Sequence, residues 1–127
     1  MGTFNVDVEI GNPSGDRYES VSALVDTGST YTVIPRPILE RLSVKPTRSA
    51  TFRLGDESTL EAEIGQTWLR IDGTSVITQV VFGAADARRL LGAYALEGLL
   101  LAADPVKQRL VPVEGLMMNA LERAGAS

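Results

Sequence analysis

Short apolar runs, each about one strand long, alternate with turn-forming residues along most of the chain. Between Phe4 and Ile10 every second residue is apolar, which is the period of a β-strand with one buried face. Strands are predicted at residues 4–10, 18–25, 31–34, 51–54, 59–71, 76–82, 100–102 and 109–113, and short helices at 38–42 and 93–99. Many short strands with one or two short helices favour a mostly β fold, either a small closed β-barrel or a sandwich.

The length of 127 residues is that of a single domain, and 44% hydrophobic with 22% charged residues is typical of a globular one. We expect the domain to span residues 1–115, and residues 116–127 to form a helical or disordered tail. The net charge of −4 argues against a nucleic-acid partner, because phosphate binding requires a basic face. Apolar runs stay well short of the ~20 residues that a membrane span needs, and residues 1–7 lack the pattern of a signal peptide. We therefore expect a cytoplasmic protein without a membrane partner.

Histidine and cysteine are both missing from the sequence. Their absence excludes Ser-His-Asp and Cys-His catalysis, and it removes thiolates and imidazoles as metal ligands. Carboxylates, hydroxyls, lysines and backbone groups remain for chemistry. We therefore expect neither a metal nor another cofactor.

Residues 22–35, Ser-Ala-Leu-Val-Asp-Thr-Gly-Ser-Thr-Tyr-Thr-Val-Ile-Pro, place an acid, Asp26, at the end of an apolar strand. A carboxylate in such a place is costly unless it is paired or hydrogen-bonded, so the arrangement indicates a functional site. Residues 23–29, followed by Thr-Val-Ile at 32–34, resemble the active-site strand and loop of the retropepsin-like aspartic proteases. This superfamily contains the retroviral proteases and many single-lobe cellular and bacterial relatives.

Two further segments support the resemblance. A polar-tipped hairpin matches the flap that follows the active-site loop in these proteases, and its tip consists of Gly55, Asp56, Glu57 and Ser58. Before the predicted helix at 93–99, the hydrophobic-hydrophobic-Gly element of the family is matched by Leu90, Leu91 and Gly92. The resemblance covers roughly residues 4–113. It implies a small closed β-barrel of the retropepsin-like type.

The resemblance also implies that the chain hydrolyses peptide bonds with Asp26 as its catalytic residue. In such enzymes two close carboxylates share one proton: one accepts a proton from the attacking water, and the other donates to the scissile carbonyl oxygen. Because the chain has one Asp-Thr-Gly, the second carboxylate must come from a second copy, which implies a homodimer acting on a peptide or protein substrate.

The residues after Asp26 have expected roles in supporting the loop. Thr27 would hydrogen-bond across the pair of subunits. The Gly28 amide would donate to the carboxylate at a place where a Cβ would intrude. The Ser29 hydroxyl would donate to the outer carboxylate oxygen.

The chain departs from the retroviral pattern at three positions. Retroviral members usually carry two acids after the small residue that follows the glycine, and an Arg after the hydrophobic-hydrophobic-Gly element. Here those positions hold Thr30, Tyr31 and Ala93. In the retroviral enzymes the first acid and the Arg belong to one ion-pair network near the dimer interface, and loss of both together leaves no charge unpaired. We therefore expect the dimer to be held differently, without retroviral-type specificity.

Two alternatives remain open at this stage. Retropepsin-like domains also serve as catalytically silent binding or dimerisation modules, and an intact Asp-Thr-Gly does not exclude this role. In addition, residues 26–32 resemble the phosphate loop of actin-like and sugar-kinase ATPases. Those folds need two lobes and a second phosphate loop downstream, and this chain lacks both.

Overall fold

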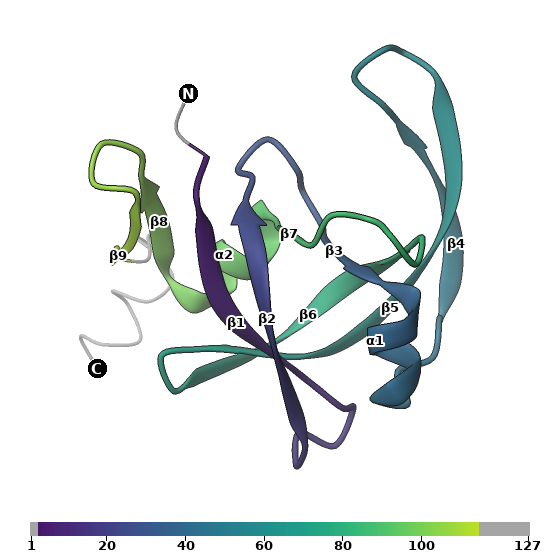
Figure 1. Cartoon of the computed structure of the whole chain (residues 1–127), viewed down its shortest axis with the longest axis horizontal. Coiled ribbons are helices and arrows are strands. Elements are labelled where there is room, and N and C mark those ends of the chain that lie inside the picture. Colours follow the sequence, from purple (N-terminus) through teal and green to yellow (C-terminus); the bar gives the residue numbers. More distant parts are fainter. Residues whose placement is uncertain (1–2, 115–127) are drawn as a thin grey trace, which may run out of the picture.

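The computed structural model describes residues 3–114 (Figure 1). Its strands are β1 (Asn5–Gly11), β2 (Tyr18–Val25), β3 (Thr32–Pro35), β4 (Arg48–Arg53), β5 (Thr59–Ile71), β6 (Thr74–Gly83), β7 (Leu90–Leu91), β8 (Leu101–Asp104) and β9 (Arg109–Pro112). Its helices are α1 (Arg36–Arg41) and α2 (Ala93–Leu99). The tail predicted at residues 116–127 lies outside the described residues. Neither helix within residues 3–114 is long and apolar enough to cross a membrane.

The main sheet closes on itself. Its seven strands follow the order β1-β2-β7-β3-β6-β5-β4, and β1 also pairs with β5. In this closing pair Glu9 lies opposite Arg70, and the two side chains form hydrogen bonds of 2.8 and 3.0 Å. The donation from Arg70 lowers the pKa of the Glu9 carboxyl. The predicted mostly β, closed architecture is confirmed, and β8 and β9 form a separate two-stranded sheet.

The core lies inside this ring of strands. The alternation predicted for the first strand holds, because Val8 and Ile10 are completely buried. Leu69 of β5 and Leu91 of β7 are buried to the same degree, and α1 adds Leu39. Burying each such side chain stabilises the fold by about 1.5–3 kcal/mol.

Most element boundaries differ from the sequence prediction by one to three residues, β7 was not predicted as a strand, and three of the differences have a clear local cause. Strand β4 begins at Arg48, because its pairing with β5 extends back to Ile64. Helix α1 begins at Arg36 with Pro37 in its first turn, where the missing proline N–H has no helical partner to lose. Strand β8 begins at Leu101, because Leu100 adopts a left-handed conformation with φ of 56° and ends α2.

Strand β7 brings distant segments together at one end of the ring. It lies between β2 and β3, parallel to β2 and antiparallel to β3, and Leu90 pairs with both Leu24 and Val33. The loop between β2 and β3 contains Asp26, and Gly92 follows β7 directly. These two segments therefore meet where the strands end (Figure 1).

Candidate active site

Asp26 lies immediately after β2, and its position is fixed through backbone hydrogen bonds. Its amide donates to the carbonyl oxygen of Leu91 at 3.0 Å, and its own carbonyl accepts from the Ser29 amide at 3.1 Å. The Gly28 amide donates to the Asp26 carboxylate at 3.1 Å, as expected. Asp26 is partly exposed. The loop thus holds a carboxylate at the surface in a defined orientation.

The same loop caps the start of α2. The first amides of a helix have no partner within the helix. Here the Ala93 amide donates to the Ser29 carbonyl at 2.8 Å, and the Tyr94 amide donates to the Thr30 carbonyl at 3.0 Å. The Gly92 amide donates to the hydroxyl oxygen of Thr32 at 3.1 Å, and Thr32 is 1% exposed. The active-site loop and α2 therefore hold each other in place.

Gly92 is required by this close approach. A Cβ built on Gly92 would lie 2.5 Å from the carbonyl oxygen of Tyr31 and 2.9 Å from that of Ser29. Both contacts are with backbone, which cannot swing aside as a side chain can. The glycine of the predicted hydrophobic-hydrophobic-Gly element thus permits the loop to pack against α2.

Two details of the loop in this single chain differ from what the sequence predicted. The Ser29 hydroxyl donates to the Tyr31 carbonyl at 2.9 Å rather than to the Asp26 carboxylate, because the turn brings that carbonyl within reach. A Cβ built on Gly28 would lie 3.4 Å from the Asp26 carboxylate oxygen, which is an ordinary contact. The steric need for glycine therefore lies at Gly92 and not at Gly28. Thr27 is exposed, and contacts across a pair of subunits stay a prediction.

A cavity of about 1090 Å³ lies between the active-site loop and the flap hairpin. Asp26 and Tyr31 line it from the loop, Leu54 and Gly55 line it from the flap, and Leu90 lines it from β7. Its size and mixed lining are those of a groove that accepts a ligand. Leu91, by contrast, is fully buried and belongs to the core.

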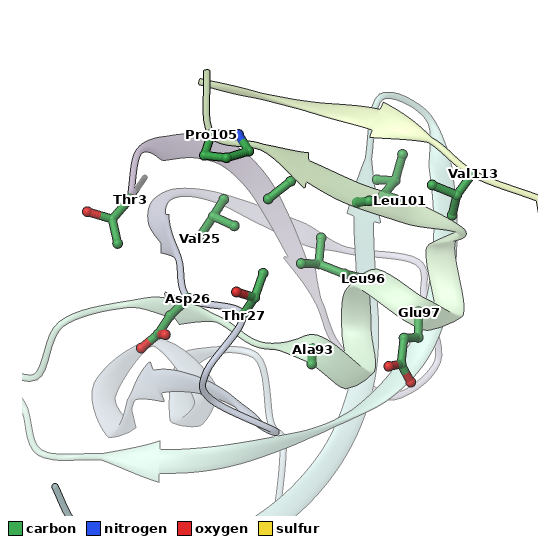
Figure 2. Close-up of a pocket in the computed structure, with 12 residues that line it drawn as sticks. Thr3, Val25, Asp26, Thr27, Ala93, Leu96, Glu97, Leu101, Pro105 and Val113 are labelled. Atoms are coloured by element: carbon green, nitrogen blue, oxygen red, sulfur yellow. The ribbon is translucent and has the colours of Figure 1, made fainter. Parts of the chain in front are cut away.

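A second cavity, of about 780 Å³, lies on the other side of Asp26. Figure 2 shows Thr27 among its lining side chains, with Leu96 of α2 and Leu101 of β8. Val113, 42% exposed, lines it near the end of the described chain. Asp26 and Thr27 therefore border a mostly apolar surface as well as the flap cavity.

The flap tip is a compact, charged turn. Asp56 accepts hydrogen bonds from the hydroxyl and the amide of Ser58, at 2.5 and 3.0 Å, and these bonds lower the pKa of its carboxyl. Glu57 takes the left-handed conformation in this turn, with φ of 72°. Of the four predicted flap residues Gly55 lines the cavity, while Asp56, Glu57 and Ser58 form the exposed turn beyond it.

Tyr31 is a site residue for which the sequence predicted no contact. Its ring packs edge-to-face against Phe52 of β4 and Tyr94 of α2. The sequence offered one signal for its importance, an aromatic residue where retroviral members carry an acid. It could not identify the partners of the ring, because Phe52 and Tyr94 are distant from Tyr31 in sequence. Among residues 3–114, no group of three or more acidic side chains is placed to hold a metal ion.

Comparison with known proteins identifies the family. Residues 6–103 match the model of a family described as aspartyl protease. The chain belongs to this family. Asp26, the flap hairpin and the Leu-Leu-Gly element of this aspartyl protease family member all lie inside the matched region. No curated protein sequence matches the chain significantly.

Solved structures of retroviral proteases share the fold. The Simian foamy virus (mac) protease is 18% identical with a TM-score of 0.53, over 74% of this chain and 92% of that one. The EIAV protease in complex with the inhibitor HBY-793 is 18% identical with a TM-score of 0.52, over 74% and 85%. A retropepsin-like aspartic protease from Rickettsia conorii is 21% identical with a TM-score of 0.49, over 76% and 71%. The two retroviral structures, each with a TM-score above 0.5, confirm the predicted retropepsin-like fold.

Proposed function

We propose that this chain is an aspartic endopeptidase whose active site is completed by Asp26 of a second copy. One observation carries the proposal: the Asp26 carboxylate is partly exposed at the border between the flap cavity and an apolar surface. The hydrogen bond from the Gly28 amide holds this carboxylate in place. Membership of the aspartyl protease family supports the reaction class.

The reaction follows from two carboxylates that share one proton. A water molecule between them gives a proton to the ionised Asp26 and attacks the carbonyl carbon of the scissile bond. The protonated Asp26 of the other subunit donates to the carbonyl oxygen. The C–N bond of the tetrahedral intermediate then breaks as the leaving nitrogen takes up the proton that the first Asp26 accepted. One hydroxyl of the intermediate returns its proton to the other Asp26, so that the carboxylic acid product forms and the pair again shares one proton.

The substrate in this proposal is an extended peptide in the cavity of about 1090 Å³. The flap hairpin closes over it and excludes water, as lids commonly do. Leu54, directly after β4, and Leu60 of β5 are 44% and 52% exposed, and in this proposal they make apolar contacts with the substrate. The second copy covers the apolar surface beside Thr27, which gives the dimer an interface that needs no ion-pair network.

Digestion of a peptide library by the wild type and by Asp26→Asn tests the proposal. The substitution keeps the shape of the side chain and removes the acid, so kcat/KM is expected to fall far more than tenfold, a loss of more than about 1.4 kcal/mol of transition-state stabilisation. Asp72→Asn is the matched control, because it makes the same change at an exposed carboxylate in the β5–β6 turn, which lines neither of the two cavities. Its activity should equal that of the wild type.

Two outcomes would contradict the proposal. Turnover by Asp26→Asn within about tenfold of the wild type would show that another group performs the chemistry. A folded, dimeric wild type that cleaves no peptide in the library would favour the silent binding module. Circular dichroism and sedimentation of each variant separate these outcomes from loss of folding or assembly.

A further inference from the structure

Three aromatic rings link the flap to the active-site loop and to α2. The Tyr31 ring packs edge-to-face against Phe52, with centroids 5.7 Å apart and an interplanar angle of 89°. It packs in the same way against Tyr94, at 5.5 Å and 88°. Edge-to-face contacts at these distances are favourable and depend on orientation. Phe52 belongs to flap strand β4, and Tyr94 lies in the first turn of α2.

At its base the flap hairpin is held by a hydrogen bond of 2.5 Å from Arg36 of α1 to Glu63 of β5, whereas the side-chain hydrogen bonds farther out stay within the hairpin. Strand β4 stands at the end of the sheet order and pairs with β5 alone among the described strands. In Figure 1 the hairpin of β4 and β5 extends away from the ring of strands. A two-stranded hairpin of this kind is marginal without packing against other elements. The contact between Phe52 and Tyr31 supplies such packing near the tip of the hairpin, because Phe52 pairs with Leu60 one step before the last pair of the ladder.

Tyr31 is itself held firmly. Its carbonyl accepts the Ser29 hydroxyl at 2.9 Å, and the neighbouring Thr30 carbonyl accepts the Tyr94 amide at 3.0 Å. The backbone around Tyr31 is therefore fixed to α2, and its ring is fixed by Tyr94. Because Phe52 of the flap strand packs against this ring, the position of the ring determines where the strand lies.

We propose that Tyr31, held by Tyr94, is a positioning residue that sets the place of the flap over Asp26 through Phe52. The inference rests on the proposed peptidase function, and it names a residue that governs substrate capture in that site. We call the three packed rings of Phe52, Tyr31 and Tyr94 the bridge. A flap that is already in place loses less freedom when the peptide binds, so the bridge lowers KM. Asp26 is held separately by Leu91 and Gly28, so kcat does not depend on the bridge.

Tyr94 provides the sharpest test. Tyr31 and Phe52 line the flap cavity and could touch a substrate directly, whereas Tyr94 is not among the described residues that line it. Tyr94→Leu keeps an apolar side chain and removes the ring, and Tyr94→Phe is the matched control that keeps the ring. With enzyme concentrated enough to be fully dimeric, we expect Tyr94→Leu to raise KM about three- to tenfold, the usual effect of one aromatic pair. Its kcat should stay within about twofold, and Tyr94→Phe should match the wild type in both constants.

A distance measurement tests the bridge without activity. Because the chain has no cysteine, Glu57→Cys on the flap and Asp86→Cys on the β6–β7 loop give two unique sites for spin labels. Doubly labelled chains are mixed into excess unlabelled protein, so that the distance measured lies within one subunit. We expect Tyr94→Leu and Phe52→Leu to broaden the distance distribution, and Tyr94→Phe to leave it unchanged.

The outcomes separate the bridge from the proposed function. Unchanged distance distributions in both leucine variants would overturn the bridge, and so would a loss confined to kcat. If no variant, including the wild type, cleaves peptides, the peptidase function fails. The distance distributions still decide whether the bridge positions the flap.

Discussion

The amide of Asp26 donates to the carbonyl oxygen of Leu91 at 3.0 Å, and this bond joins the end of β2 to β7. The residue proposed as catalytic is therefore placed by a segment far from it in sequence. The loop after Asp26 then caps α2, which begins at Ala93 and is separated from β7 by Gly92 alone. Changes around Gly92 should consequently affect both the stability of the fold and the geometry at Asp26.

Substitution of Gly92 by alanine should damage the fold and the activity together. The added Cβ would meet the Tyr31 carbonyl oxygen at 2.5 Å, so the loop or α2 must move. Such overpacking costs about 1–3 kcal/mol, and urea denaturation measures it. Gly55→Ala is the matched control, because a Cβ there meets nothing within 4 Å. Equal stability of the two variants would contradict the close packing.

Replacement of Thr32 by valine should weaken the same junction through a hydrogen bond. Valine has the shape of threonine, but it leaves the buried Gly92 amide without the acceptor that now lies at 3.1 Å. An unsatisfied buried donor costs about 1–3 kcal/mol. Hydrogen exchange of the Gly92 amide should become faster in Thr32→Val and not in Thr32→Ser. Equal exchange in both variants would mean that the hydroxyl is unimportant.

Local patterns in the sequence were sufficient to predict most of the pieces of this site. The acid at the end of an apolar strand marked Asp26, and the polar hairpin tip marked the flap, because turns and alternation depend on neighbouring residues. The position of α2 followed from the Leu-Leu-Gly element and its family resemblance. These features are confirmed as structure, while their catalytic roles stay proposals.

Non-local contacts could not be predicted in this way. The insertion of β7 between β2 and β3 depends on pairings between distant residues, which no local pattern encodes. The contacts of Tyr31 with Phe52 and Tyr94 are of the same kind. The Ser29 hydroxyl was assigned the wrong acceptor within the chain, because the Tyr31 carbonyl competes with the carboxylate and is closer along the turn.

The turn at the flap tip should depend on pH through Asp56. Hydrogen bonds from the Ser58 hydroxyl and then from its amide lower the pKa of the Asp56 carboxyl below 3.8. The ionised form is the bonded one, so these bonds are fully present above pH 3.8 and are lost as the pH falls through the lower pKa of the folded state. The Ser58 amide signal in NMR should therefore titrate with a midpoint below 3.8, and the titration should vanish in Asp56→Asn. A midpoint at or above 3.8 would mean that the turn does not favour the ion.

The requirement for two copies of Asp26 can be tested by mixing. Each chain supplies one Asp-Thr-Gly, so a dimer of one wild-type and one Asp26→Asn chain contains a single catalytic carboxylate and should be inactive. If chains exchange freely, an about fourfold excess of Asp26→Asn leaves roughly a fifth of the wild-type chains paired with one another. We expect activity to fall to that level, and an equal excess of a double variant, Asp26→Asn with a substitution that abolishes dimerisation, should have no effect.

Specific activity of the wild type alone should also fall on dilution, in step with the dimer fraction measured by sedimentation. Activity that ignores both the added Asp26→Asn chain and dilution would mean that one subunit carries out catalysis alone, which is incompatible with paired carboxylates.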